Sequence, residues 1–189
     1  MTDISRARVL ILATDGFEQS ELEVPMKELR NRGATFHVAA PAKTLRSGEI
    51  MGWDGADWGR AVPVDMTLDA VDDASYDALV LPGGVINPDK LRVEPKAIEI
   101  IRSFVGDGRI VAAICHGPWL LAEADAADGR QMTSYASIRT DMENAGAHWI
   151  DKEVVTDEGI ITSRSPEDLP AFIAKIVEEI GEGRHQRAA

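Results

Sequence analysis

The sequence predicts an α/β fold in which a mostly parallel sheet is covered on both faces by helices. Short apolar runs typical of buried strands alternate with amphipathic, helix-like segments along the chain. The first strand, helix and strand fit within residues 8–40, the length of one βαβ unit, so these strands should be parallel neighbours. The 189 residues suit one domain of this class, and we expect it to cover residues 1–189 with a core over about 8–180.

The first βαβ unit has recognisable signals. We expect a buried strand at 8–14, a turn at 15–17, a helix at 18–32 and a strand at 35–40. The helix shows apolar side chains at three- and four-residue spacing. Pro25 should kink the helix, and Gly33 should end it in the usual carboxyl-cap manner.

The rest of the chain continues the alternation of strands and helices. We expect short strands or a hairpin at a sheet edge in the glycine-rich residues 43–75, strands at 77–81, 109–114, 131–135, 149–155 and 159–163, and helices at 90–105, directly after 115–118, at 139–145 and from Ser165 to Ile180. The last helix has a strong start, with a capping hydroxyl followed by proline and two acids. Residues 181–189 are expected to be a frayed tail.

Composition narrows the function classes. The net charge is −12, from 20 basic and 32 acidic residues, which argues against a constitutive nucleic-acid or membrane partner. The single cysteine implies no internal disulfide and a reducing compartment. The apolar run at 9–13 is too short for a membrane span and lacks a cleavage site, so we expect a cytoplasmic protein.

Cys115 is the most informative residue. It follows the apolar run at 109–114 and opens a corner of sequence Cys-His-Gly-Pro before a helix-like segment. In α/β folds such a corner lies at the carboxyl edge of the sheet, where ligands and nucleophiles are placed. The start of the following helix should lower the pKa of the thiol. The alternative is a structural cysteine that packs as a small hydrophobe, but the corner and the adjacent His116 favour a nucleophile.

Two further corners should reach the same sheet edge. Glu18, at the first strand-to-helix turn, could hydrogen-bond the sulfur if protonated; the alternative is an acid that only complements the dipole of its own helix. Gly83 and Gly84 follow the strand at 77–81, and their amide together with the His116 amide could point at an oxyanion near Cys115. The alternative for the glycine pair is a tight turn that only redirects the chain.

The remaining candidates concern the histidines. If the His116 ring reaches the sulfur it needs an orienting acid, and Asp89 is the candidate by loop position, although it could equally cap the helix beginning at Lys90. The four histidines, at 37, 116, 148 and 185, show no metal-ligand spacing. No phosphate loop or dinucleotide glycine signature is present. We therefore expect neither a metal nor a cofactor.

Six segments together resemble the ThiJ/PfpI family, and most closely its PfpI-type branch of intracellular proteases and general stress proteins. They are residues 15–21, 81–84, 87–92, 113–118, 141–146 and 162–170. The resemblance spans residues 8–180, and the string Ala-Ile-Cys-His-Gly-Pro around Cys115 is its most specific part.

The resemblance implies a flavodoxin-like three-layer sandwich similar to the class-I glutamine amidotransferases. It implies Cys115 as an elbow nucleophile, Glu18 as the carboxyl partner of the sulfur, and the amides of Gly84 and His116 as the oxyanion site. In the PfpI-type branch an acid from the neighbouring subunit completes a Cys-His-acid triad; here it is Asp89, in a loop one residue longer than the family's. The resemblance also implies a homo-oligomer, a dimer or a hexamer built from dimers.

The family's members have peptidase, glyoxalase, deglycase, chaperone and oxidative-sensor roles. The related amidotransferases carry a His-x-Glu after their cysteine; here His148 and His185 lead into Trp-Ile-Asp and Gln-Arg-Ala, which argues against glutamine hydrolysis. We expect a stress-response enzyme in which Cys115 attacks α-oxoaldehydes or their protein adducts. The alternatives are an intracellular cysteine peptidase and a non-enzymatic oxidative-stress sensor or chaperone with an oxidisable cysteine.

Overall fold

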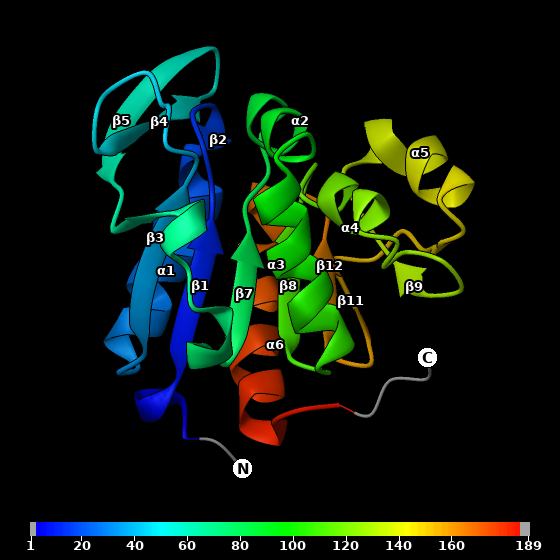
Figure 1. Ribbon diagram of the computed structural model, residues 1–189. Helices are drawn as coiled ribbons and strands as arrows, with labels where there is room; N and C mark the ends of the chain where they lie inside the picture. The colour runs from blue at the N-terminus through cyan, green and yellow to red at the C-terminus, as the bar shows by residue number, and fades with distance from the viewer. Residues whose placement is uncertain (1–2, 186–189) are drawn as a thin grey trace.

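A seven-stranded sheet of order β11-β12-β8-β7-β1-β3-β6 forms the centre of the computed structural model, which describes residues 3–185 (Figure 1). Its strands are β1 (Arg8–Leu12), β3 (Thr35–Ala40), β6 (Met66–Thr67), β7 (Ala78–Leu81), β8 (Ile110–Ile114), β11 (Val154–Asp157) and β12 (Ile160–Ser163). Five neighbouring pairs are parallel and only β11 and β12 pair antiparallel. The predicted mostly parallel sheet is therefore confirmed.

Helices cover both faces of this sheet, which gives the three layers seen in Figure 1. They are α1 (Gln19–Asn31), α2 (Ile86–Leu91), α3 (Pro95–Gly106), α4 (Trp119–Glu123), α5 (Arg139–Asn144) and α6 (Leu169–Glu182). Alternate residues of β1 enter opposite cores: Val9 and Ile11 pack with residues of α1 and α6, whereas Leu10 and Leu12 pack with α3. The flavodoxin-like sandwich is confirmed.

A small second sheet stands above the carboxyl end of β1. It consists of β2 (Phe17–Glu18), β4 (Glu49–Asp54) and β5 (Asp57–Pro63), in which β4 and β5 form an antiparallel hairpin and β2 pairs parallel to β4. The expected hairpin within residues 43–75 is therefore present. It carries Trp53 and places it beside Glu18, its partner in the register.

The predicted helix at 90–105 is instead two helices, α2 and α3, and this changes the position of Asp89. Pro95 begins α3, and Glu94 before it is extended, with φ −91° and ψ 105°. A residue before proline is pushed out of the helical region, and proline cannot donate the hydrogen bond that would continue a helix. Asp89 consequently lies inside α2, in its first turn, and does not precede a helix as a cap.

Other boundaries also differ from the prediction. The expected strand at 131–135 is reduced to β9 (Gln131–Met132), and the expected strand at 149–155 is divided between β10 (His148–Trp149) and β11. Helix α1 runs through Pro25, and Gly33 follows it with φ +96°, as a carboxyl cap requires.

The predicted frayed tail is only partly right. Helix α6 extends to Glu182, and the His185 amide donates to the Gly108 carbonyl at 2.8 Å. Residues 186–189 lie outside the described residues. Within residues 3–185, none of the helices is both long enough and apolar enough to span a bilayer.

Candidate active site

Cys115 occupies a strained turn directly after β8. Its φ is +62°, a left-handed conformation that a residue with a Cβ rarely adopts and that costs about 1–3 kcal/mol. The backbone is fixed on both sides: the Cys115 amide donates to the Ser163 carbonyl at 3.0 Å, and the Tyr135 amide donates to the Cys115 carbonyl at 2.8 Å. Such strain is typical of a nucleophile elbow, in which the turn projects the side chain away from the sheet.

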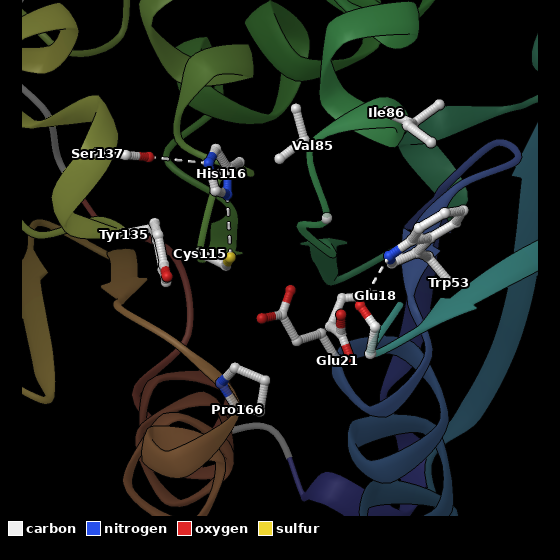
Figure 2. Close-up of a pocket in the computed structure, with 12 residues that line it drawn as sticks. Glu18, Glu21, Trp53, Val85, Ile86, Cys115, His116, Tyr135, Ser137 and Pro166 are labelled. Carbon is white, nitrogen blue, oxygen red and sulfur yellow. Dashed lines mark hydrogen bonds between the residues drawn. The ribbon is translucent and has the colours of Figure 1, made fainter. Parts of the chain in front are cut away.

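The side chain of Cys115 lines a cavity of about 560 Å³ at the carboxyl edge of the sheet. The cavity is lined by Glu18, Glu21, Trp53, Gly55, Gly84, Val85, Ile86, Cys115, His116, Tyr135, Ser137 and Pro166. Figure 2 shows Cys115, His116, Tyr135 and Ser137 on one side, and Glu18, Glu21 and Trp53 on the other. The cavity includes residues from each of the three predicted strand-to-helix turns, at 15–18, 83–89 and 115–118.

The carboxyl group that interacts with the sulfur belongs to Glu21, not to Glu18. Glu21 lies in the first turn of α1 and is fully buried, and its Oε2 accepts a hydrogen bond from the Gly83 amide at 2.8 Å. Glu18 lies in β2, before the helix begins, and its half-buried carboxylate accepts a hydrogen bond from the Ser20 hydroxyl at 3.3 Å. The role that the resemblance implied for Glu18 therefore falls to a residue one helical turn later.

Burial determines the charge state of Glu21. It is the main cause that raises the pKa of this carboxyl to about 8, against an ordinary 4.5, and the hydrogen bond from the Gly83 amide only partly opposes it. Glu21 is therefore protonated at neutral pH. Its Oε1 is buried and has no hydrogen-bond partner among the residues described, so a proton on this carboxyl can be donated within the cavity.

The expected lowering of the thiol pKa by a helix start is wrong. Helix α4 begins only at Trp119 and has five residues, so its dipole is small and distant from the sulfur. Burial raises the pKa of Cys115, and the negative charge of ionised Glu21 raises it further. Hydrogen bonds from the backbone amides of Gly84 and His116 lower it. At rest the thiol therefore carries its proton and needs a base.

His116 is placed to be that base. Its Nδ1 lies 3.2 Å from the Cys115 sulfur, and its Nε2 lies 3.1 Å from the Ser137 hydroxyl. A single neutral tautomer satisfies both contacts, with the thiol donating to Nδ1 and Nε2–H donating to Ser137. Burial lowers the pKa of His116, which favours this neutral form. Tyr135 stacks on the ring with centroids 4.9 Å apart, and Trp119 meets it edge-on at 5.2 Å.

Asp89 does not reach His116 within the chain. It is exposed on α2, whereas the second ring nitrogen of His116 is bonded to Ser137. The pairing of Cys115 with His116 and the approach of the Gly84 and His116 amides to the sulfur occur as expected. The sequence indicated that Ser137 could line a pocket, which is confirmed, but it did not predict the contact of Ser137 with His116 or the role of Glu21. Glu21 had a signal, since it belongs to the same motif as Glu18.

Gly83 explains why the loop after β7 can approach the nucleophile. A Cβ on Gly83 would lie 2.6 Å from the Cys115 Cβ, 2.6 Å from Glu21 Oε2 and 2.7 Å from the Ile114 carbonyl oxygen. The position admits only glycine because the backbone itself packs against the elbow. This close approach brings the amides of the glycine pair to the carboxyl and to the sulfur.

The chain is similar to known proteins over most of its length. Residues 7–179 match the family model described as "DJ-1/PfpI family". The chain is 41% identical over 171 residues to deglycase PfpI of Pyrococcus furiosus, covering 90% of this chain and 98% of that protein. It is 40% identical over 166 residues to general stress protein 18 of Bacillus subtilis, covering 87% and 92%. It is 39% identical over 175 residues to protein/nucleic acid deglycase 2 of Escherichia coli, covering 92% and 98%.

Solved structures show the same fold. Drosophila melanogaster DJ-1beta superposes with a TM-score of 0.80 at 29% identity, covering 93% of this chain and 94% of that one. A two-domain protein from Anabaena variabilis, with a dj-1/thij/pfpi-like and a ferritin-like domain, gives a TM-score of 0.85 at 32% identity. The match covers 93% of this chain and 48% of that longer one.

Proposed function

The chain belongs to the DJ-1/PfpI family, and we propose that it is a stress-response deglycase that removes α-oxoaldehyde adducts from protein side chains. The observation that most supports this function is the position of the Cys115 thiol: it stands on a strained elbow, 3.2 Å from the His116 Nδ1, and lines a cavity of about 560 Å³. Relatives at about 40% identity that bear the name deglycase support the same reading.

The first proposed step releases the amine. His116 takes the thiol proton through Nδ1 while the sulfur bonds to C1 of the adduct, the former aldehyde carbon. The bond between C1 and the amine nitrogen breaks, and the imidazolium returns its proton to the leaving nitrogen. The products are the restored amine and a hemithioacetal on Cys115.

The second proposed step needs no external oxidant. The hydrogen on C1 moves as a proton to C2 through an enediolate, so that C1 is oxidised to a thioester while the C2 ketone is reduced to an alcohol. Water then hydrolyses the thioester and releases a 2-hydroxy acid and the free thiol. The amides of Gly84 and His116 are the donors for the enediolate oxygen, and the protonated Glu21 adds no negative charge beside it.

The size of the site favours this chemistry over peptide hydrolysis. Cys115 is only 6% exposed, and a cavity of about 560 Å³ accommodates a side-chain adduct better than an extended peptide. Because the reaction requires a reduced thiol, we place the activity in the cytoplasm. The test is lactate release from methylglyoxal-modified Nα-acetylamino acids by the purified protein. Peptide hydrolysis without lactate release would make it a peptidase instead.

We further propose that the active form is a homo-oligomer in which Asp89 of a second copy approaches His116. The exposure of Asp89 on α2 leaves it accessible to another protomer. Asp89→Asn is expected to lower kcat about tenfold at concentrations where the chain is oligomeric, because the base loses an orienting acid. Kinetics combined with light scattering checks this. Full activity in an oligomeric variant would leave Ser137 as the group that orients His116.

A further inference from the structure

The side of the cavity opposite Cys115 is formed by an aromatic and an acidic residue, Trp53 and Glu18. Trp53 and Glu18 are register partners on the parallel strands β4 and β2, and both line the cavity. Figure 2 shows them together, across the cavity from Cys115 and His116. Trp53 is held in place, because its Nε1 donates to the Gly55 carbonyl at 3.1 Å and its ring meets Trp58 edge-on at 5.4 Å.

The charges that act on Glu18 are those of carboxylates. Burial is the main cause that raises the pKa of Glu18, hydrogen bonds from Ser20 oppose it, and the negative charges of Asp54 and Glu167 raise the pKa further. Among the described residues that line the cavity there is no lysine or arginine, and His116 is neutral through burial. Glu21 adds a fully buried carboxyl whose Oε1 has no partner among the described residues. The cavity therefore offers acceptors and an aromatic surface but no cation.

We propose that Trp53 and Glu18 form a guanidinium subsite, which makes arginine adducts the preferred substrates of the chain. The proposal rests on the proposed deglycase function and specifies its substrate class. A guanidinium is planar, keeps its charge at all relevant pH values, binds carboxylates through two parallel hydrogen bonds and stacks on aromatic rings. In an arginine adduct the guanidinium is bonded directly to C1, the carbon that the sulfur attacks. One small cavity can therefore hold the guanidinium at the subsite and C1 at Cys115.

Turnover of three matched substrates tests this preference. The substrates are the methylglyoxal adducts of Nα-acetylarginine, Nα-acetyllysine and Nα-acetylcysteine, with lactate release as the readout. The arginine adduct is expected to have the highest kcat/KM. Glu18→Gln should lower that value about tenfold through KM while changing the cysteine value less than twofold. Glu49→Gln removes one charge from the same strand as Trp53, outside the cavity, and should change none of them.

A binding measurement separates the failure of the subsite from the failure of the proposed function. Nα-acetylarginine amide should slow iodoacetamide alkylation of Cys115, whereas its neutral isostere Nα-acetylcitrulline amide should not, and Glu18→Gln should remove the difference. Arginine-specific protection without turnover of any adduct would keep the subsite and overturn the deglycase. Turnover combined with equal protection by the two amides would overturn the subsite. So would a Glu18→Gln variant that loses kcat/KM equally on the arginine and the cysteine adducts.

Discussion

Replacing Cys115 with alanine is expected to abolish turnover of methylglyoxal adducts, with a loss of about 10³-fold or more, because nucleophile removal stops both steps of a covalent mechanism. The chain has one cysteine, so no second thiol can substitute for it. Lactate release by equal amounts of wild type and variant measures the loss.

The variant should remain folded, which keeps the kinetic result interpretable. Alanine retains the Cβ and therefore the same strained φ of +62°, and only the sulfur atom is lost from the packing. Circular dichroism and a thermal transition close to that of wild type provide the control. Retained turnover would contradict the mechanism. A wild type without turnover, but with two oxygens added persistently to Cys115 by mild peroxide, would indicate the oxidative sensor.

Replacing Glu21 with glutamine is expected to stabilise the protein at alkaline pH. Its pKa of about 8, against an ordinary 4.5, means that the folded state holds the proton more tightly than the unfolded state. Its contribution to stability is then complete below about pH 4.5 and is lost progressively as the pH rises towards 8. At about 1.4 kcal/mol per pH unit, the loss approaches about 5 kcal/mol by pH 9.

Urea denaturation at pH 5, 7 and 9 measures this effect. The free energy of unfolding of wild type should fall with pH more steeply than that of Glu21→Gln, in which the amide stays neutral and can still accept the Gly83 hydrogen bond. Glu28→Gln, on the same helix α1, is the matched control and should follow wild type. Parallel pH profiles for wild type and Glu21→Gln would show that the buried carboxyl is not held protonated.

The sequence predicted the architecture well because the strands carry their own signal. The apolar runs at β1, β7 and β8 are buried on both faces, and such runs alternate with helical spacing only in a parallel α/β fold. The elbow was predictable for the same reason, since Cys115 stands at the first residue after a buried strand. The two-residue strands β9 and β10 carry too short a pattern to be located.

The site residues were harder to predict because side-chain direction depends on where each helix begins. Helix α1 begins at Gln19, so Glu18 belongs to strand β2 and not to the helix. Glu21, within the helix, is the carboxyl that interacts with the sulfur. Pro95 likewise separates α3 from α2, and Asp89 lies exposed within α2. Ser137 reaches His116 from 21 positions away, a contact that only the tertiary structure determines.

The pH dependence of Cys115 alkylation, measured on wild type and Glu21→Gln, tests whether the thiol reacts through neutral His116 while Glu21 holds its proton. Because burial lowers the pKa of His116 from its ordinary value of 6.5, the alkylation rate of wild type should rise at a pH below 6.5, as the imidazole loses its proton. The rate should then fall as Glu21 ionises near pH 8. Glu21→Gln should lose only the alkaline fall. A rate that climbs smoothly through pH 8 and is the same in both proteins would show that neither the neutral imidazole nor the protonated Glu21 carboxyl controls the reactivity of Cys115.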